Sequence, residues 1–195
     1  QALIRDKRHP ELYLLPSAQT KDKTAVSPEQ MIKLTQELRE EFDYVLLDTT
    51  STFSRLNLTV MDLSTIITFV GIVDFIPTIK NMKIGYDTMR SIGYGSNKIR
   101  LILNRSDSKT NIALNDVQQV LGENFYHIIP NDFTAAQESI HAGIPLTAAA
   151  RDNSVRESIR QLIGRYTNRL NVPEEKTAKL SGWVKRIFKQ GDNNG

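Results

Sequence analysis

The 195-residue chain has no cysteine and a single tryptophan. Without cysteine it can form no disulfide, thiol nucleophile or thiolate metal site, which fits a reducing compartment. No apolar run approaches the roughly 18 residues that a transmembrane helix needs, and no signal-peptide pattern opens the chain. Hydrophobic residues (39%) and charged residues (24%) are both at globular levels, which excludes a disordered, collagenous or low-complexity protein.

A strong excess of one charge is also absent from most of the chain. The net charge is +3, of which +2 lies in the tail from Asn171 onward and +1 in the body before it. A nearly neutral body argues against broad electrostatic binding of nucleic acid. The length allows one domain with a sizeable core, or a domain plus an appendage.

Familiar catalytic constellations are missing as well. His9, His127 and His141 show no metal-binding spacing, so we interpret them as structural or surface residues. No Ser-His-Asp set and no paired carboxylates indicate a hydrolase. A phospho-acceptor receiver domain would need an acidic pair after an earlier strand and a lysine after a later one, and this chain offers neither.

Short apolar runs alternate with helical segments along the body. The runs cover residues 12–15 (LYLL), 44–47 (YVLL), 65–70 (TIITFV), 99–103 (IRLIL) and 125–129 (FYHII). Most of them lack polar alternation, which is typical of strands in a parallel sheet with both faces covered. The sequence therefore predicts an α/β fold, a mostly parallel sheet flanked by helices with right-handed crossovers.

Local signals set the predicted helices between these strands. Ser27, Pro28 and Gln30 form a capping box with proline at the first helical position, which predicts a helix to about residue 41. A second helix from Pro77 places four apolar side chains on one face and ends at Gly93. Further helices are predicted near residues 114–121, 133–142 and 153–170. Asp132 is placed to cap the helix over residues 133–142.

Polar side chains follow the strand runs, at the edge where open α/β sheets bind ligands. Asp48 follows YVLL, and a carboxylate there can hold Mg²⁺ through water or merely cap the next turn. Asn104 follows IRLIL, and its amide can contact a base edge or serve as a turn residue. Position alone leaves both alternatives open, and it favours a plain helix N-cap for Asp132.

Several longer stretches resemble a known family. Residues 12–31 (LYLLPSAQTKDKTAVSPEQM) and the FDYVLLD segment ending at Asp48 resemble the MinD branch of the ParA/MinD P-loop ATPases. Residues 50–146 are closer to the CpaE/TadZ pilus-assembly relatives, on the segments IPTIKNMK, SIGYGSNKIRLILNRSD and IPNDFTAAQESIHAGIPL. The resemblance implies a P-loop NTPase-like fold of the deviant Walker A class.

The resemblance also implies a cytoplasmic ATPase that dimerises around ATP and Mg²⁺ and acts at the inner face of the cell membrane. Asp48 matches the acidic residue that ends the Walker B-like strand, so it is the expected metal-site residue. Asn104 matches the asparagine that contacts adenine, and Pro130 and Asp132 match the segment that lines the base pocket. These four residues are the expected cofactor-binding set.

The chain departs from this family at two places. It has no G-x-x-x-x-G-K-[ST] loop, so we expect it to be the C-terminal portion of a longer ATPase, with the first strand of the sheet missing. Thr50 and Thr52 stand where the MinD pattern has proline and glycine. We therefore assign no catalytic residue within the chain and no ATPase activity to the chain alone.

The tail predicts a separate membrane-binding element. We expect an ATPase domain over residues 1–170, a linker over 171–178 and an amphipathic helix over 179–190, with apolar side chains at i, i+3, i+4, i+7 and i+8. Its expected membrane-binding residues are Lys179, Leu180, Trp183, Val184, Lys185, Arg186, Ile187, Phe188 and Lys189. A last helix packed on the domain is the alternative.

These features predict a MinD/ParA-type ATPase that positions a membrane-associated machine, of the pilus-assembly type. It would act as a nucleotide-dependent homodimer, bind an anionic membrane surface and contact an unidentified protein of that machine. A septum-site-determining MinD-like ATPase is one alternative, and a non-hydrolysing binding module of the same fold is another. The near-neutral body disfavours DNA binding.

Overall fold

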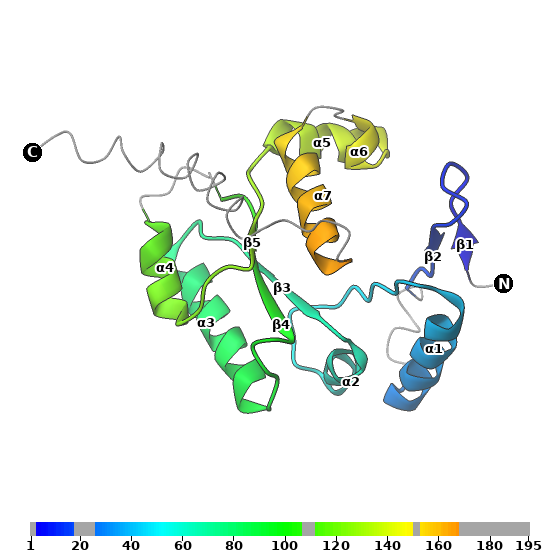
Figure 1. Ribbon diagram of the computed structural model, residues 1–195, viewed down its shortest axis with the longest axis horizontal. Coiled ribbons are helices and arrows are strands. Elements are labelled where there is room, and N and C mark those ends of the chain that lie inside the picture. The colour runs from blue at the N-terminus through cyan, green and yellow to red at the C-terminus, as the bar shows by residue number, and fades with distance from the viewer. Residues whose placement is uncertain (1–2, 18–25, 107–111, 150–152, 168–195) are drawn as a thin grey trace, which may run out of the picture. The chain divides into compact units, whose positions relative to one another are not determined.

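The computed structural model describes residues 3–17, 26–106, 112–149 and 153–167 (Figure 1). The chain divides into two compact units, Gln1–Ile67 and Thr68–Gly195, and each is described by itself. The predicted single ATPase domain over residues 1–170 stays a prediction. The predicted linker, the predicted amphipathic helix and the last residues of the predicted helix 153–170 lie outside the described residues.

The first unit begins with a small hairpin. Strands β1 (Ile4–Arg5) and β2 (Tyr13–Leu14) pair antiparallel, with Ile4 opposite Leu14. The Asp6 carboxylate accepts hydrogen bonds from the N–H groups of Arg8 and His9 and so shapes the turn. The prediction that residues 12–15 form a covered parallel strand is wrong, because they pair with a local segment and both strands are exposed.

Two helices complete the first unit. Helix α1 (Pro28–Glu41) begins with the predicted capping box: Gln30 N–H donates to Ser27 Oγ, and Ser27 N–H donates to Gln30 Oε1. Helix α2 (Arg55–Leu63), capped by Ser54, packs with α1 and was not predicted. Its asparagine, threonine and valine are poor helix formers, whereas its arginine, leucines and methionine favour a helix.

The predicted strand at residues 44–47 is absent from the described structure. These residues have no regular secondary structure, and Leu46 is 90% exposed. An apolar run becomes a strand only when a neighbour pairs with its N–H and C=O groups, and among the described residues no strand does so. The sequence therefore indicated the apolar character but not the pairing.

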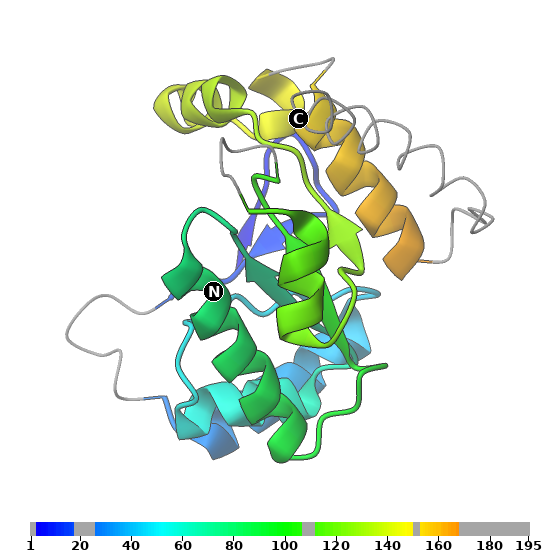
Figure 2. The ribbon, with the colours of Figure 1, turned by 90° about the vertical axis from the view of Figure 1, so that its left-hand side faces the viewer.

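The second unit contains a three-stranded sheet in the order β3 (Ile67–Gly71), β4 (Ile99–Leu103), β5 (His127–Ile128). Strands β4 and β5 pair parallel, with Ile102 opposite His127. Helices α3 (Ile76–Ser91) and α4 (Leu114–Leu121) connect the strands and lie side by side on one face (Figures 1 and 2). Helix α7 (Ser154–Tyr166) covers the other face. The predicted α/β class is confirmed.

The core of this unit follows the predicted pattern. Helix α3 buries Ile79, Met82, Tyr86 and Met89, the four residues that the sequence placed on one face. Strand β4 lies in the centre and is covered on both sides, and Ile102 is fully buried against Ile129 and Leu162 of α7. Helix α5 (Phe133–Ala142) has Asp132 as its N-cap, as predicted, and is followed by the short α6 (Leu146–Ala149).

Glycine ends helix α4 in a conformation that other residues adopt at a cost. Gly122 has φ +71° and its N–H donates to Gln118 O, an αL cap. Replacing Gly122 with alanine is expected to lower the free energy of unfolding by about 1–2 kcal/mol, because a Cβ disfavours this conformation. Urea denaturation measures the change. Ser91→Ala in α3 is the control, and an equal effect of both substitutions would contradict the backbone explanation.

His127 is buried between β5 and α7. Its Nε2 lies 2.9 Å from both O and Oγ of Ser158, and the Ser158 hydroxyl donates to Ile128 O. Because that hydroxyl proton is already used, Nε2 carries the hydrogen of a neutral ring. Burial lowers the pKa of His127 from its ordinary value of 6.5, and the nearby positive charge of Arg165 lowers it further, against the effect of the Ser158 bond.

This burial makes stability depend on pH. The unfolded chain binds a proton near pH 6.5 and the folded chain only at lower pH, so the contribution of neutral His127 is complete above 6.5. It is expected to be lost as the pH falls through the folded-state pKa, by less than about 1.4 kcal/mol per pH unit. Urea unfolding between pH 5 and 7.5 measures the slope. His127→Gln should flatten it, whereas His141→Gln, an exposed control, should not.

No helix in the described part of the chain is long and apolar enough to cross a membrane.

Candidate functional site

The carboxyl ends of the three strands in the second unit are tied together by backbone bonds. Asn104 N–H, directly after β4, donates to Gly71 O at the end of β3 over 2.8 Å. Ser106 N–H donates to Ile129 O over 3.1 Å, and Ile129 N–H donates to Leu103 O over 2.8 Å. The predicted residues Asn104 and Pro130 therefore follow neighbouring strands at one edge of the sheet, as expected.

Asn104 has one side-chain atom engaged locally. Its Oδ1 accepts a hydrogen bond from Arg105 N–H over 3.0 Å. No bond joins its amide NH₂ group to another described residue, and Oδ1 keeps a second lone pair. The hydrogen bond to Arg105 N–H is what a turn residue would form. The remaining donor and lone pair are what contact with a base edge requires.

Arg105 is a residue of this edge that sequence reasoning missed. It has φ +56° and is the sole non-glycine residue with positive φ in the described ranges. Its guanidinium NH1 lies 3.6 Å from Asp74 Oδ2, on a carboxylate that is 15% exposed. The ion pair joins the end of β4 to the loop before α3. The available signal was a charged residue directly beside Asn104.

Asp132 connects the starts of helices α5 and α7 in the described part of the chain. One carboxylate oxygen accepts from Ala135 N–H over 2.9 Å and caps α5. The other accepts from Asn153 Nδ2 over 2.5 Å, and Asn153 itself caps α7. Both oxygens are thus engaged, so the carboxylate holds the starts of two helices together. A role for Pro130 and Asp132 in lining a base pocket stays a prediction.

Asp48 belongs to the first unit. Its carboxylate is exposed and has no hydrogen bond or ion pair with the described residues. Within the described ranges, no group of three or more His, Asp or Glu side chains could hold a metal ion. A single carboxylate can still hold Mg²⁺ through its water shell. The metal-site role of Asp48 stays a prediction.

The loop after Asp48 is organised by a second residue that sequence reasoning missed. Asn57, near the start of α2, is 7% exposed, and its Nδ2 lies 2.8 Å from Thr50 Oγ1 and 2.7 Å from Thr52 O. The Thr50 and Thr52 hydroxyls lie 3.0 Å apart. These two threonines stand where the MinD pattern has proline and glycine, so a buried amide supports the altered loop.

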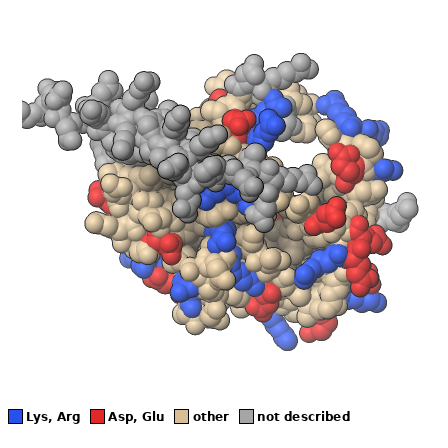
Figure 3. All heavy atoms as spheres, in the orientation of Figure 1, with Lys and Arg blue, Asp and Glu red and all other residues tan. Residues whose placement is uncertain are grey.

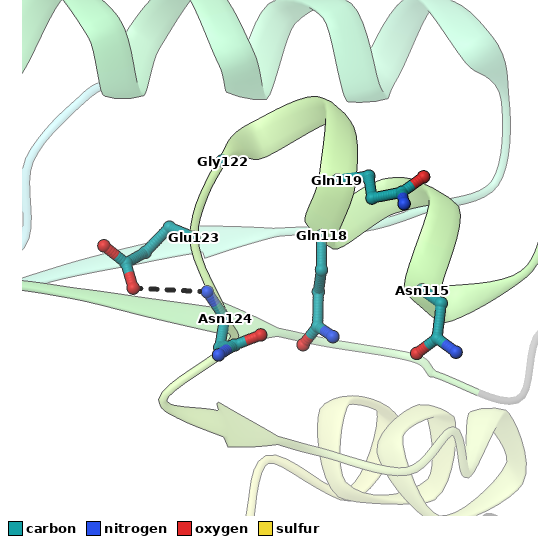
Figure 4. A pocket seen from close by; sticks show the side chains of 6 residues that line it. All are labelled: Asn115, Gln118, Gln119, Gly122, Glu123 and Asn124. Atoms are coloured by element: carbon teal, nitrogen blue, oxygen red, sulfur yellow. Dashed lines mark hydrogen bonds between the residues drawn. The ribbon is translucent and has the colours of Figure 1, made fainter.

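A polar hollow of about 430 Å³ lies elsewhere in the second unit (Figure 4). It is lined by Asn115, Gln118, Gln119, Gly122, Glu123 and Asn124. Glu123 Oε1 accepts from Asn124 N–H and Gln118 Oε1 accepts from Phe125 N–H, so two of its carboxylate and amide oxygens are already used. The residues that line the hollow come before β5 in the chain, whereas Pro130 comes after β5. The hollow therefore does not belong to the predicted edge at the carboxyl ends of the strands.

Curated relatives share two kinds of similarity with the chain. The septum site-determining protein MinD of Bacillus subtilis is 61% identical over 49 residues, which is 25% of this chain and 18% of that protein. MinD of Escherichia coli K12 is 26% identical over 202 residues, which is 96% of this chain and 73% of that protein. The first match is thus strong but short, and the second is weak but nearly complete.

A solved structure adds the fold. A ParA family ATPase from Chlorobium tepidum matches with a TM-score of 0.73 and 22% identity, over 79% of this chain and 64% of that chain. No family model matches. The sequence matches support a member of the ParA/MinD superfamily, and the structural match shows the fold.

The sequence matches agree with the predicted ParA/MinD family, and the structural match confirms the P-loop NTPase-like fold class. The CpaE/TadZ subtype is not distinguished by these comparisons and stays a prediction. The chain covers 18% of the length of the Bacillus relative, so the activity and partners of the whole protein are proposals.

The conformation of the loop after Asp48 should depend on Asn57. Replacing Asn57 with alanine is expected to lower the free energy of unfolding by about 1–3 kcal/mol, because carbonyl and hydroxyl oxygens of Thr50 and Thr52 lose their donor. Urea denaturation gives the value. Thr59→Ala, which removes one bond within α2, is the control. A loss no larger than that of the control would mean that water replaces the amide.

Proposed function

We propose that the chain is part of a MinD-like ATPase that positions a membrane-associated machine, in the manner of septum-site determination. The observation that carries this proposal is the similarity to proteins named septum site-determining MinD, at 61% identity over 49 residues and 26% over nearly the whole chain. ATP-dependent dimerisation would control its residence on an anionic membrane from the cytoplasmic side.

The residues of the sheet edge support nucleotide binding in part. Among the described residues, the Asn104 NH₂ group has no hydrogen-bond acceptor and Oδ1 keeps a lone pair, which suit the donor and acceptor pattern of adenine. Asp132 uses both oxygens on helix starts, so it would shape the base pocket without touching the base. Asp48 would bind Mg²⁺ through water. Bound ATP would supply the phosphoryl group that is transferred to water.

The phosphates need groups that this chain does not provide. Its sequence contains no G-x-x-x-x-G-K-[ST] motif, so ATP and Mg²⁺ would be held together with a phosphate-binding loop outside these 195 residues. The homodimer would form around the bound nucleotide, so we propose that it needs the same phosphate-binding loop. The tail helix over residues 179–190 would supply the membrane contact, and an unidentified protein of the positioned machine would be the partner.

One structural observation favours a second candidate, a non-hydrolysing binding module of the same fold. The Thr50 and Thr52 hydroxyls bond to Asn57 and to each other, so the loop after Asp48 is held by its own side chains. A loop engaged in this way has less freedom to respond to a γ-phosphate. The pilus-assembly role remains the further subtype to test, since residues 50–146 resemble CpaE/TadZ proteins.

ATP binding by the protein expressed from its native gene tests the proposal. We expect Mg²⁺-dependent binding and an ATP-dependent dimer in sedimentation. Asn104→Ala should weaken ATP binding by about tenfold and leave binding of inorganic triphosphate unchanged, because only the base contact is lost. Asn97→Ala is the exposed control. Absence of any nucleotide binding would leave the binding module as the function.

A liposome assay tests the membrane part separately. Trp183→Glu is expected to abolish ATP-dependent binding to vesicles containing anionic lipid and to leave ATP binding itself unchanged. Vesicle binding that is unchanged by this substitution would contradict the assignment of the tail as the membrane anchor.

A further inference from the structure

Two arginines and a tyrosine surround one aromatic ring in the second unit. The guanidinium carbon of Arg165 lies 3.8 Å from the centroid of the Tyr126 ring, and that of Arg100 lies 4.9 Å from the same centroid. The Tyr166 ring is stacked on Tyr126 at 5.7 Å and an interplanar angle of 9°. We call these four residues the Arg-Tyr cluster.

The Arg-Tyr cluster lies at the amino ends of the strands. Arg100 is the second residue of β4, and Tyr126 immediately precedes β5 and donates its N–H to Leu101 O. Tyr166 ends α7, and its hydroxyl lies 3.0 Å from Thr68 Oγ1 in β3. The cluster is therefore at the opposite edge of the sheet from Asn104 and is independent of the proposed nucleotide site.

The positive charge of the cluster has no counter-charge among the described residues. Neither Arg100 nor Arg165 forms an ion pair there; they donate to the backbone oxygens of Ser96 and Tyr126. Two guanidinium groups within 5 Å of one ring centre repel each other. Burial raises the pKa of Tyr166, so its hydroxyl is neutral and offers no negative charge.

One donor in the cluster is also unsatisfied. The Nε–H of Arg100 is buried and has no hydrogen-bond partner in the described part of the chain. A buried donor without an acceptor costs about 1–3 kcal/mol, so such an atom in a native protein indicates a missing acceptor. The cluster thus combines unpaired positive charge with an unused donor and half-buried aromatic surface.

We propose that Arg100 and Arg165 form a binding site for a phosphate group. A phosphate carries about −1.5 to −2 charges near pH 7 and three acceptor oxygens, which matches two guanidinium forks better than a single carboxylate does. The proposal rests on these two arginines and not on a broad basic surface, because basic and acidic side chains are interspersed on the face shown in Figure 3. The phosphate belongs to a phosphorylated small molecule or to a lipid headgroup.

NMR titration of the 195-residue chain with inorganic phosphate tests the proposal. The Nε–H signals of Arg100 and Arg165 are expected to shift in a saturable manner, while chloride at equal ionic strength leaves them unchanged. Arg100→Gln should weaken phosphate binding by about tenfold, because one charged contact is lost. Arg160→Gln removes an exposed arginine from the same helix as Arg165 and should leave the affinity unchanged. Small shifts shared by all arginines would overturn the proposal.

Further measurements keep the proposal testable if Arg100→Gln affects folding, and identify the source of the phosphate. Arg100→Lys keeps the charge but not the fork, and is expected to bind phosphate more weakly than the wild type while remaining folded. Binding in the absence of ATP to phosphatidylcholine vesicles that contain phosphatidic acid, weakened in Arg100→Lys and unchanged in Trp183→Glu, would identify the headgroup. Saturable binding of free phosphate without such vesicle binding would identify a small molecule. No saturable binding of either probe would overturn the site.

Discussion

Replacing Met89 with alanine is expected to lower the free energy of unfolding by about 2–5 kcal/mol. Met89 lies on α3 with no exposed surface, and it shares the buried face with Met82 and Tyr86. Truncation removes three heavy atoms from a closely packed interior and leaves a cavity that the neighbours fill only in part. Urea denaturation followed by circular dichroism measures the change in the midpoint.

Ile84→Ala on the same helix is the matched control. Ile84 is 54% exposed, and alanine has the higher helix propensity, so the substitution should change stability by less than about 0.5 kcal/mol. Similar losses at both positions would show that the buried face of α3 contributes no more than its exposed face. The packing of the second unit would then need a different description.

Helices were predictable because their determinants are local. The capping box at Ser27 and Gln30, the Asp132 cap and the glycine at residue 122 each act within one helical turn, and all three are confirmed. The buried face of α3 follows from the spacing of its apolar residues alone. Helix α2 was missed although Ser54 caps it and Arg, Leu and Met favour it; nine residues are marginal as an isolated helix, and α2 packs with α1.

Strands depend on partners that the local sequence does not specify. The run IRLIL forms β4 with the predicted bounds, since it lies between two strands and is covered on both faces. The equally apolar runs at residues 12–15 and 44–47 differ: the first forms an exposed hairpin, and the second has no paired neighbour in the described structure. Composition alone could not separate these cases.

The candidate site was predictable where a residue follows a strand. Asn104 and Pro130 lie at the expected edge because β4 and β5 were found from their apolar runs. Asn57 and Arg105 were missed, since their roles depend on a buried amide reaching a loop seven residues earlier and on a positive φ. Neither property leaves a pattern in a single sequence.

Under the proposed function, replacing Asp48 with asparagine is expected to reduce the Mg²⁺-dependent ATPase rate of the protein expressed from its native gene by roughly 10–100-fold. This magnitude is typical of losing a carboxylate that holds a metal ion through its water ligands, because asparagine keeps the shape but removes the negative charge. Excess Mg²⁺ should restore part of the rate, since metal affinity is what falls. Steady-state hydrolysis at several Mg²⁺ concentrations measures both effects.

Two controls distinguish a metal-binding role of Asp48 from a structural one: the unfolding midpoint of Asp48→Asn and the ATPase rate of Asp43→Asn. Asp48 is exposed and has no partner among the described residues, so Asp48→Asn should leave the unfolding midpoint unchanged. Asp43→Asn removes an exposed carboxylate five residues earlier and should leave the ATPase rate unchanged. If Asp48→Asn has the rate and Mg²⁺ dependence of the wild type, Asp48 is a turn residue. The Mg²⁺ contact would then have to come from another residue, and the described part of the chain offers no group of three or more His, Asp or Glu side chains for it.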